Sequence, residues 1–127
     1  MKFRVVPILL LILALIPLVG CAKKADSKRA IEKIRKEVKT MPLVELEVYA
    51  SAYAAAIRAQ KTKITKIQQQ IQKMSVDKVF NSKSMTHRIA EIGREAEALF
   101  VRYRIYVQAF QEKGGDLAKV RLEPAQS

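Results

Sequence analysis

Apolar residues recur at alternating spacings of three and four over residues 43–74, which is the pattern of one apolar stripe along a long α-helix. The stripe consists of Leu43, Leu46, Ala50, Tyr53, Ile57, Gln60, Ile64, Ile67, Ile71 and Met74. Gln60 is its single polar member, and no Gly or Pro interrupts the segment. Such a regular alternation is typical of a coiled-coil seam.

A second stripe of the same kind predicts a helix over residues 82–113. It consists of Met85, Ile89, Ile92, Ala96, Leu99, Tyr103, Tyr106 and Phe110. Asn81, Ser82 or Ser84 can cap its first turn, and Gly114-Gly115 form a C-terminal stop signal. The connection, residues 75–81, is read as a loop short enough to make the two helices antiparallel neighbours.

Folding the chain at residue 78 sets the two stripes against each other as one seam. Ala96 then lies opposite Gln60, and Tyr106 lies opposite Ala50, so that large residues meet small ones. A register shifted by one heptad closes less well and remains the alternative. The four tyrosines, Tyr49, Tyr53, Tyr103 and Tyr106, gather at the end away from the loop, where they either pack together or line a ligand pocket.

A shorter helix is expected over residues 27–40, because Ile31, Ile34, Val38 and Met41 form a third apolar stripe. Asp26 or Ser27 can cap its start, and Pro42 disfavours helical geometry in the residue before it. After residue 115, Val120 and Leu122 alternate weakly, but one short strand has no partner. Residues 116–127 are therefore expected to be an extended or disordered tail.

Further apolar residues lie off the seam at the end of the hairpin away from the loop. They are Val44, Val48, Ala52, Ala55 and Ala59 on one helix, and Ala98, Val101, Ile105 and Ala109 on the other. Either the helix over 27–40 covers them, or they form an oligomer interface. The predicted fold is all-α: an antiparallel, coiled-coil-like helical hairpin with a shorter N-terminal helix packed at its base as a three-helix bundle. The arm, residues 58–95, is expected to remain a bare pair of helices.

The first twenty residues differ in character from the rest. Lys2 and Arg4 precede an uncharged apolar run over residues 5–19, which contains Pro7 and Pro17. A membrane-spanning helix needs roughly 20 apolar residues, so this run is too short and is interrupted at both ends. A charged start, a short apolar run and a small-residue end are typical of a secretory signal peptide, here residues 1–20.

The segment Leu18-Val19-Gly20-Cys21 resembles the lipobox of bacterial lipoproteins. The resemblance covers residues 1–21 and implies lipid transfer to the Cys21 sulfur, cleavage between Gly20 and Cys21, and acylation of the new amino terminus with palmitate-type chains. Residues 21–26 then form a polar tether. Ala22 stands where an Asp would resemble an inner-membrane retention signal, which favours the outer membrane and its periplasmic side. An ordinary signal cleaved nearby, or an uncleaved anchor, is the alternative.

Positive charge concentrates near this cysteine. The chain carries 24 Lys and Arg against 12 Asp and Glu, for a net charge of +12. Without the signal it becomes +10, and residues 21–42 contribute +5 of that. Candidate residues for binding an anionic surface are Lys23, Lys24, Lys28 and Arg29 beside the lipid, and Lys61, Lys63 and Lys66 on the arm. Alternatively, the same Lys and Arg residues serve only to form the helices and to keep their surfaces solvated.

The sequence gives little indication of a catalytic or metal-binding site. One Cys and one His cannot build a His/Cys metal cage, and one Cys cannot form an internal disulfide. His87 has no carboxylate or serine on its helical face that completes a relay, and the four Gly form no phosphate-binding loop. No catalytic residue, metal ligand or cofactor is predicted, and secretion argues against nucleic acid as a partner.

The sequence therefore predicts a non-enzymatic lipoprotein of the bacterial cell envelope, anchored by lipid to a membrane. It would present a basic helical hairpin as an adaptor, assembly or structural factor. The alternative is a binding module for an anionic envelope polymer, such as a wall polymer, or for a membrane surface. A protein partner or a second copy of the chain would bind through the coiled-coil surface.

Overall fold

The computed structural model of the chain describes residues 25–122, except for the side chains of residues 79–81. Its elements are α2 (Ile31–Thr40), α3 (Leu43–Gln72), α4 (Val76–Asn81), α5 (Lys83–Glu112) and a short 3₁₀ helix, η2 (Leu117–Val120). The described part of the chain contains no strand, so the fold is all-α as predicted. Residues 1–24, which include the predicted signal peptide and Cys21, and residues 123–127 lie outside the described residues.

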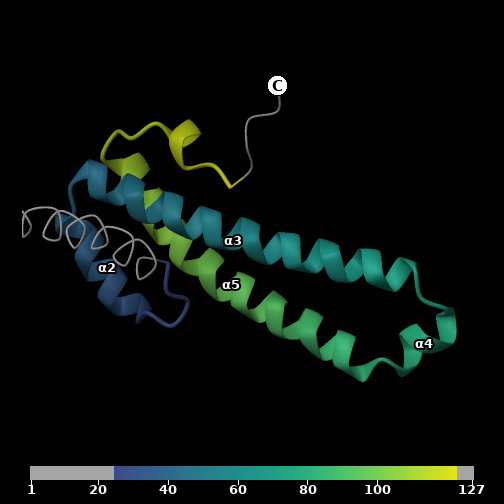
Figure 1. The fold of residues 1–127 in the computed structure, drawn as a ribbon. Coiled ribbons are helices and arrows are strands. Elements are labelled where there is room, and N and C mark those ends of the chain that lie inside the picture. The colour runs from purple at the N-terminus through teal and green to yellow at the C-terminus, as the bar shows by residue number, and fades with distance from the viewer. Residues whose placement is uncertain (1–24, 123–127) are drawn as a thin grey trace, which may run out of the picture.

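Helices α3 and α5 form the predicted antiparallel hairpin, with α4 at its turn (Figure 1). Tyr106 of α5 stacks on both Tyr49 and Tyr53 of α3, with ring centroids 5.0 and 5.4 Å apart. These partners flank Ala50, which is the residue predicted to lie opposite Tyr106, so the seam has the predicted register at this end to within a helical turn.

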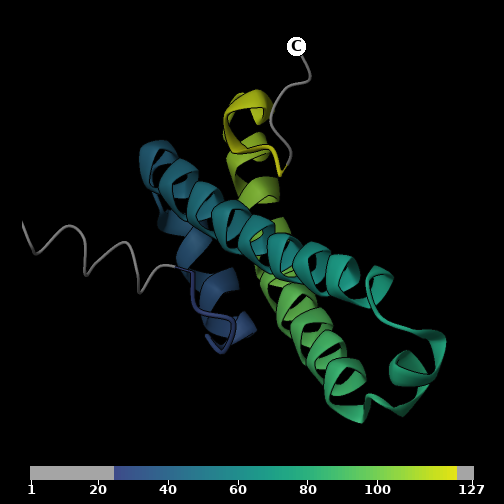
Figure 2. The same ribbon diagram turned by 45° about the vertical axis from the view of Figure 1, so that its right-hand side comes forward.

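The core lies at the base of the hairpin, where α2 packs mainly against α5 (Figure 2). Ile34 and Val38 of α2 are buried there, as are Leu46 and Tyr53 of α3. The prediction that the N-terminal helix packs at the base is confirmed. In the arm, by contrast, the seam residues other than Ile67 are only half-buried, because two helices alone cannot enclose them.

Two segments before α5 differ from the sequence prediction. Helix α2 begins at Ile31 instead of 27, because the Asp26 carboxylate accepts a hydrogen bond from the Lys28 amide at 2.9 Å and holds a turn there. The predicted loop 75–81 contains α4, which has no Gly or Pro and carries Asp77 in its first turn, where the helix dipole favours an acid.

The tail also differs from its prediction, since residues 116–122 are packed. The Asp116 carboxylate accepts a hydrogen bond from the Ala118 amide and starts η2, which contacts both α3 and α5. Val120 is buried, and its carbonyl accepts a hydrogen bond from the Tyr103 hydroxyl. In the sequence, Val120 and Leu122 alternate with polar residues but have no second strand to pair with. In the structure, this segment packs instead against α3 and α5, on the side of the hairpin away from α2 (Figure 1).

Gly114 and Gly115 end α5 as the sequence predicts, through a Schellman arrangement. Gly114 has a φ of 87°, and its amide donates to the Gln111 carbonyl, while the Gly115 amide donates to the Phe110 carbonyl. A Cβ on Gly115 would lie 2.5 Å from the ring of Phe110, which is itself buried.

We expect Gly115→Ala to lower the free energy of unfolding by about 1–3 kcal/mol, because the buried ring cannot move away without displacing the core. Urea denaturation followed by circular dichroism measures the change. Gly93→Ala is the matched control, since a Cβ there meets nothing within 4 Å. Equal stability of Gly115→Ala and the parent would contradict the contact.

Candidate functional site

The outer face of α2 presents the densest group of exposed cations that the structure brings together. Ile34 and Val38 point into the core, so the helical repeat turns Lys33, Lys36 and Lys39 toward solvent, where all three are exposed. Arg35 on the same helix forms an ion pair with Glu32 at 2.8 Å. This leaves three lysines for which no ion pair is found within the described residues.

The turn before α2 is fixed to the base by hydrogen bonds from both long helices. The Tyr53 hydroxyl of α3 donates to the Asp26 carbonyl at 2.8 Å, and the Arg102 guanidinium of α5 donates to the Arg29 carbonyl at 2.9 Å. The Lys113 ammonium donates to the Met41 carbonyl at the other end of α2. Both ends of α2 are thus held, and its outer face has a defined direction.

Arg29, predicted to lie on an anion-binding surface, instead turns into the base. Its guanidinium forms an ion pair with Glu37 and lies 5.5 Å from the centre of the Tyr49 ring. Burial by itself would lower the pKa of Arg29, but a Tyr49 hydrogen bond and the electrostatic interactions of Arg29 with Tyr106 and Glu37 outweigh it and raise the pKa. Arg29 is a structural cation here, and Lys28 beside it remains exposed.

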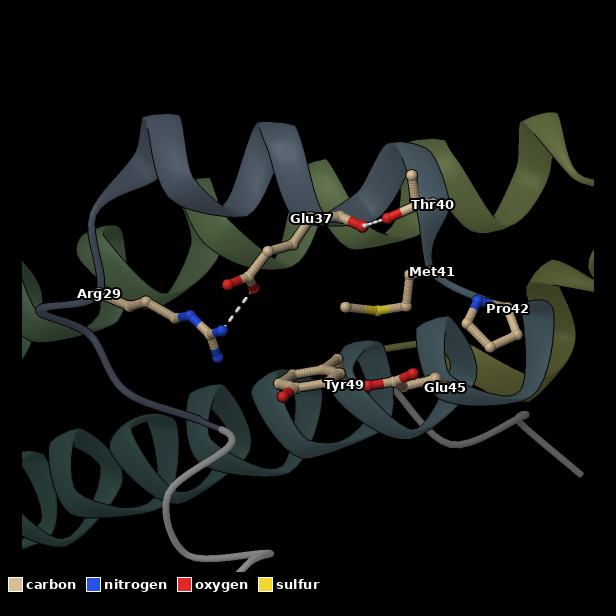
Figure 3. A pocket seen from close by; sticks show the side chains of 7 residues that line it. All are labelled: Arg29, Glu37, Thr40, Met41, Pro42, Glu45 and Tyr49. Carbon is tan, nitrogen blue, oxygen red and sulfur yellow. Dashed lines mark hydrogen bonds and ion pairs between the residues drawn. The ribbon is translucent and has the colours of Figure 1, made fainter.

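A pocket of about 330 Å³ opens between α2 and α3 beside this ion pair (Figure 3). It is lined by Arg29, Glu37, Thr40, Met41, Pro42, Glu45 and Tyr49. Arg29 is already paired with Glu37, and the remaining carboxylate, on Glu45, is exposed. The lining therefore lacks a nucleophile next to a base, the minimal arrangement for covalent catalysis.

Tyr106 is the one buried polar group whose oxygen has no hydrogen-bond partner among the described residues. Its side chain is 0% exposed, and the removal of its hydroxyl from water raises its pKa far above the ordinary value of tyrosine. A tyrosine held neutral in this way cannot act as a base. Tyr49, Tyr53 and Tyr106 stack on one another in the base, and Tyr49 also lines the pocket beside Arg29. Tyr103 packs separately against η2.

The cations of the arm do not form one patch. Lys61, Lys63 and Lys66 are all exposed, but successive residues turn by 100°, so Lys61 and Lys63 point to nearly opposite sides of α3. Arg58, at the start of the arm, donates to the carbonyls of Arg121 and Leu122 and holds the tail. Sequence reasoning grouped these residues by proximity along the chain and missed this angular separation.

His87 has a carboxylate neighbour that the sequence reading overlooked. Its Nε2 atom lies 3.0 Å from Glu91 one turn later, and both side chains are largely exposed. Within residues 25–122, no three His, Cys, Asp or Glu side chains gather as a metal site would require.

Cys21, predicted to carry the lipid, and Gly20, predicted to precede the cleavage point, lie outside the described part, as do Lys23 and Lys24. None of the helices that the structure describes has the length and apolar character needed to cross a membrane. Comparison of the chain with protein-family models, curated proteins and solved structures finds no match.

Proposed function

We propose that this chain is a non-enzymatic envelope lipoprotein, held to a membrane by lipid on Cys21, that presents its helical hairpin as an adaptor or assembly factor. The segment Leu18-Val19-Gly20-Cys21 is the observation that carries the proposal. Two acyl chains anchor a protein stably where a single short chain does not.

The base of the hairpin supports this arrangement. Only three residues separate Cys21 from Ala25, and the turn that follows is fixed by Tyr53 and Arg102. Four extended residues reach at most about 14 Å, so a lipid on Cys21 would keep the base close to the headgroups. The fixed outer face of α2 would then lie within reach of the membrane.

Metabolic labelling with an alkyne fatty acid tests the anchor. The wild-type chain should incorporate the label and partition with the membrane fraction, whereas Cys21→Ala should incorporate none, because no other thiol exists in the chain. An unlabelled wild-type chain, or label that survives in Cys21→Ala, would refute the lipoprotein proposal. Lys28→Gln, a nearby exposed substitution, is the matched control and should be labelled normally.

The second candidate function, supported by the exposed lysines of α2, is binding to an anionic surface. Basic residues next to a lipid anchor contribute on the order of 1 kcal/mol each against anionic headgroups, within about a Debye length. Membrane headgroups fit this face better than a long polymer fits the arm, whose lysines point in different directions. Binding to phosphatidylglycerol vesicles should weaken as salt is added, and binding that ignores ionic strength would exclude this function.

A further inference from the structure

The outer face of α3 at the base of the hairpin is apolar and uncovered. Helix α2 covers the flank of α5 that contains Ile105 and Ala109, but the off-seam residues of α3 remain in solvent. Val44 is 73% exposed and Val48 is 38% exposed, and Ala55 and Ala59 farther along the same face are exposed as well. Of the two predicted fates of these residues, coverage by the first helix therefore holds for Ile105 and Ala109 of α5, whereas Val101 of α5 stays exposed.

On α3, this apolar character is confined to the base of the hairpin. Along the same face of α3, Ala59 is followed by Thr62 and Lys66, which are exposed and polar. The equivalent outer face of α5 is mixed, since Phe100 and Val101 are exposed there among the polar residues Glu97, Arg104 and Gln108. The face formed by Val44, Val48, Ala52, Ala55 and Ala59 is hereafter the α3 outer face.

We propose that the α3 outer face binds the same face of a second copy of this chain, with the two α3 helices antiparallel. A two-fold axis near residues 53–54 would place Val48 opposite Ala59 of the other copy and Ala52 opposite Ala55. Valine then meets alanine at Val48 and Ala59, and the small side chains of Ala52 and Ala55 allow the two helices to approach closely. Val44 lies at the edge of the contact, beside Lys63 of the other copy.

The charges beside the face select this orientation. Glu45 and Lys63 lie on the same flank of α3, 18 residues or five helical turns apart, and neither has an ion pair within the described residues. In an antiparallel pair, the flank of one α3 helix lies beside the same flank of the other. Glu45 of each copy therefore lies beside Lys63 of the other copy, and the symmetry gives two such charge pairs. A parallel pair would instead bring Lys63 toward Arg58 of the other copy, which places like charges together.

The same geometry keeps both copies on one membrane. The two-fold axis is perpendicular to the plane of the two α3 helices, so rotation about it leaves both α2 helices on the same side of the pair. Tyr49 and Glu45 mark the flank of α3 that faces α2, as Figure 3 shows. The lysines of both α2 helices then face in one direction, and the two hairpins lie along the surface with their arms pointing apart.

A membrane is a poorer occupant of the α3 outer face itself. Glu45 and Glu47 flank it, which opposes anionic headgroups, and it contains no aromatic side chain of the kind that anchors an interfacial helix. A second copy supplies the basic partner for Glu45 that a membrane lacks.

Cysteine cross-linking of the full chain in bacterial cells tests the pairing. Ala55→Cys lies near the proposed axis and should give a cross-linked species of twice the chain mass with a short bismaleimide. Val44→Cys, also on the face and exposed, should not, because in the antiparallel pair its two copies are about 28 Å apart along the helices. The wild-type chain, with Cys21 alone, gives the background.

Charge reversal in the Ala55→Cys chain tests the orientation. Glu45→Lys alone and Lys63→Glu alone should each reduce cross-linking roughly tenfold, since each places two like-charged pairs at the contact. The double variant Glu45→Lys with Lys63→Glu should restore it. Absence of a dimer, an equal yield from Val44→Cys, adducts of another mass, or no restoration would each overturn the proposal.

The pairing and the lipid anchor can fail separately. Fatty-acid labelling of the same samples reports on Cys21, whereas the cross-link reports on α3. An unlabelled chain that still forms the dimer would refute the anchor alone, and a labelled chain without the dimer would refute the pairing alone.

Discussion

Tyr106→Ala is expected to lower the free energy of unfolding by about 3–5 kcal/mol, the cost of emptying a large aromatic site in a core. Tyr106 is fully buried, and it stacks on Tyr49 and Tyr53 of the opposite helix. Its loss removes the contact that joins the two long helices at the base, and the neighbouring rings cannot fill the space. Urea denaturation of the chain beginning at Ala22 measures the effect.

Tyr106→Phe should behave in the opposite way, leaving stability unchanged or raising it by about 1 kcal/mol. The Tyr106 hydroxyl is buried without a hydrogen-bond partner, so its removal relieves a desolvation cost and keeps the ring. Tyr53→Phe is the matched control, because the Tyr53 hydroxyl donates to the Asp26 carbonyl and its loss should cost about 1 kcal/mol. If Tyr106→Phe destabilised as much as Tyr53→Phe, the Tyr106 hydroxyl must have a partner.

Replacing Lys33, Lys36 and Lys39 together by glutamine should weaken binding to phosphatidylglycerol vesicles by roughly 100-fold, at about 1 kcal/mol for each lysine. The three side chains share the outer face of a helix whose ends are both fixed. The chain beginning at Ala22, produced without lipid, is the appropriate material, because an acyl anchor would mask the electrostatic contribution.

The matched control is the triple variant of Lys61, Lys63 and Lys66 to glutamine, which removes the same charge from the arm. Since those side chains point to different sides of α3, it should weaken binding several-fold less than the α2 variant. Equal losses from the two triple variants would mean that net charge alone governs binding. The proposed role of α2 as the membrane-facing surface would then be wrong.

Much of the fold could be predicted from periodicity. The alternation of three and four locates both long helices, and Gly114 and Gly115 end α5 where the pattern stops. Short segments were harder, since α4 has too few residues to show a period. The tail was read as a strand without a partner, because its pattern gives no indication of a groove formed by residues far away in sequence.

The candidate surface on α2 was likewise predictable from the sequence only in part. Counting charges along the chain found the basic segment around α2, but it grouped Arg29 with the surface lysines. The side chain of Arg29 pairs with Glu37 because the turn at Asp26 directs it inward, and that turn depends on Tyr53 and Arg102. Likewise, Arg58 was assigned to a basic arm and instead holds the tail.

The sequence by itself determined the three longer helices, the antiparallel pairing of α3 and α5 and the register of the tyrosines to within a helical turn, because these follow from the spacing of apolar residues along one chain. It also contained the lipobox-like segment, which depends on adjacent residues only. Tertiary structure alone decided which face of α3 stays uncovered and where the charges point. Both depend on α2 packing on one side of the hairpin and the tail packing on the other. Contacts between residues distant in sequence fix these two positions.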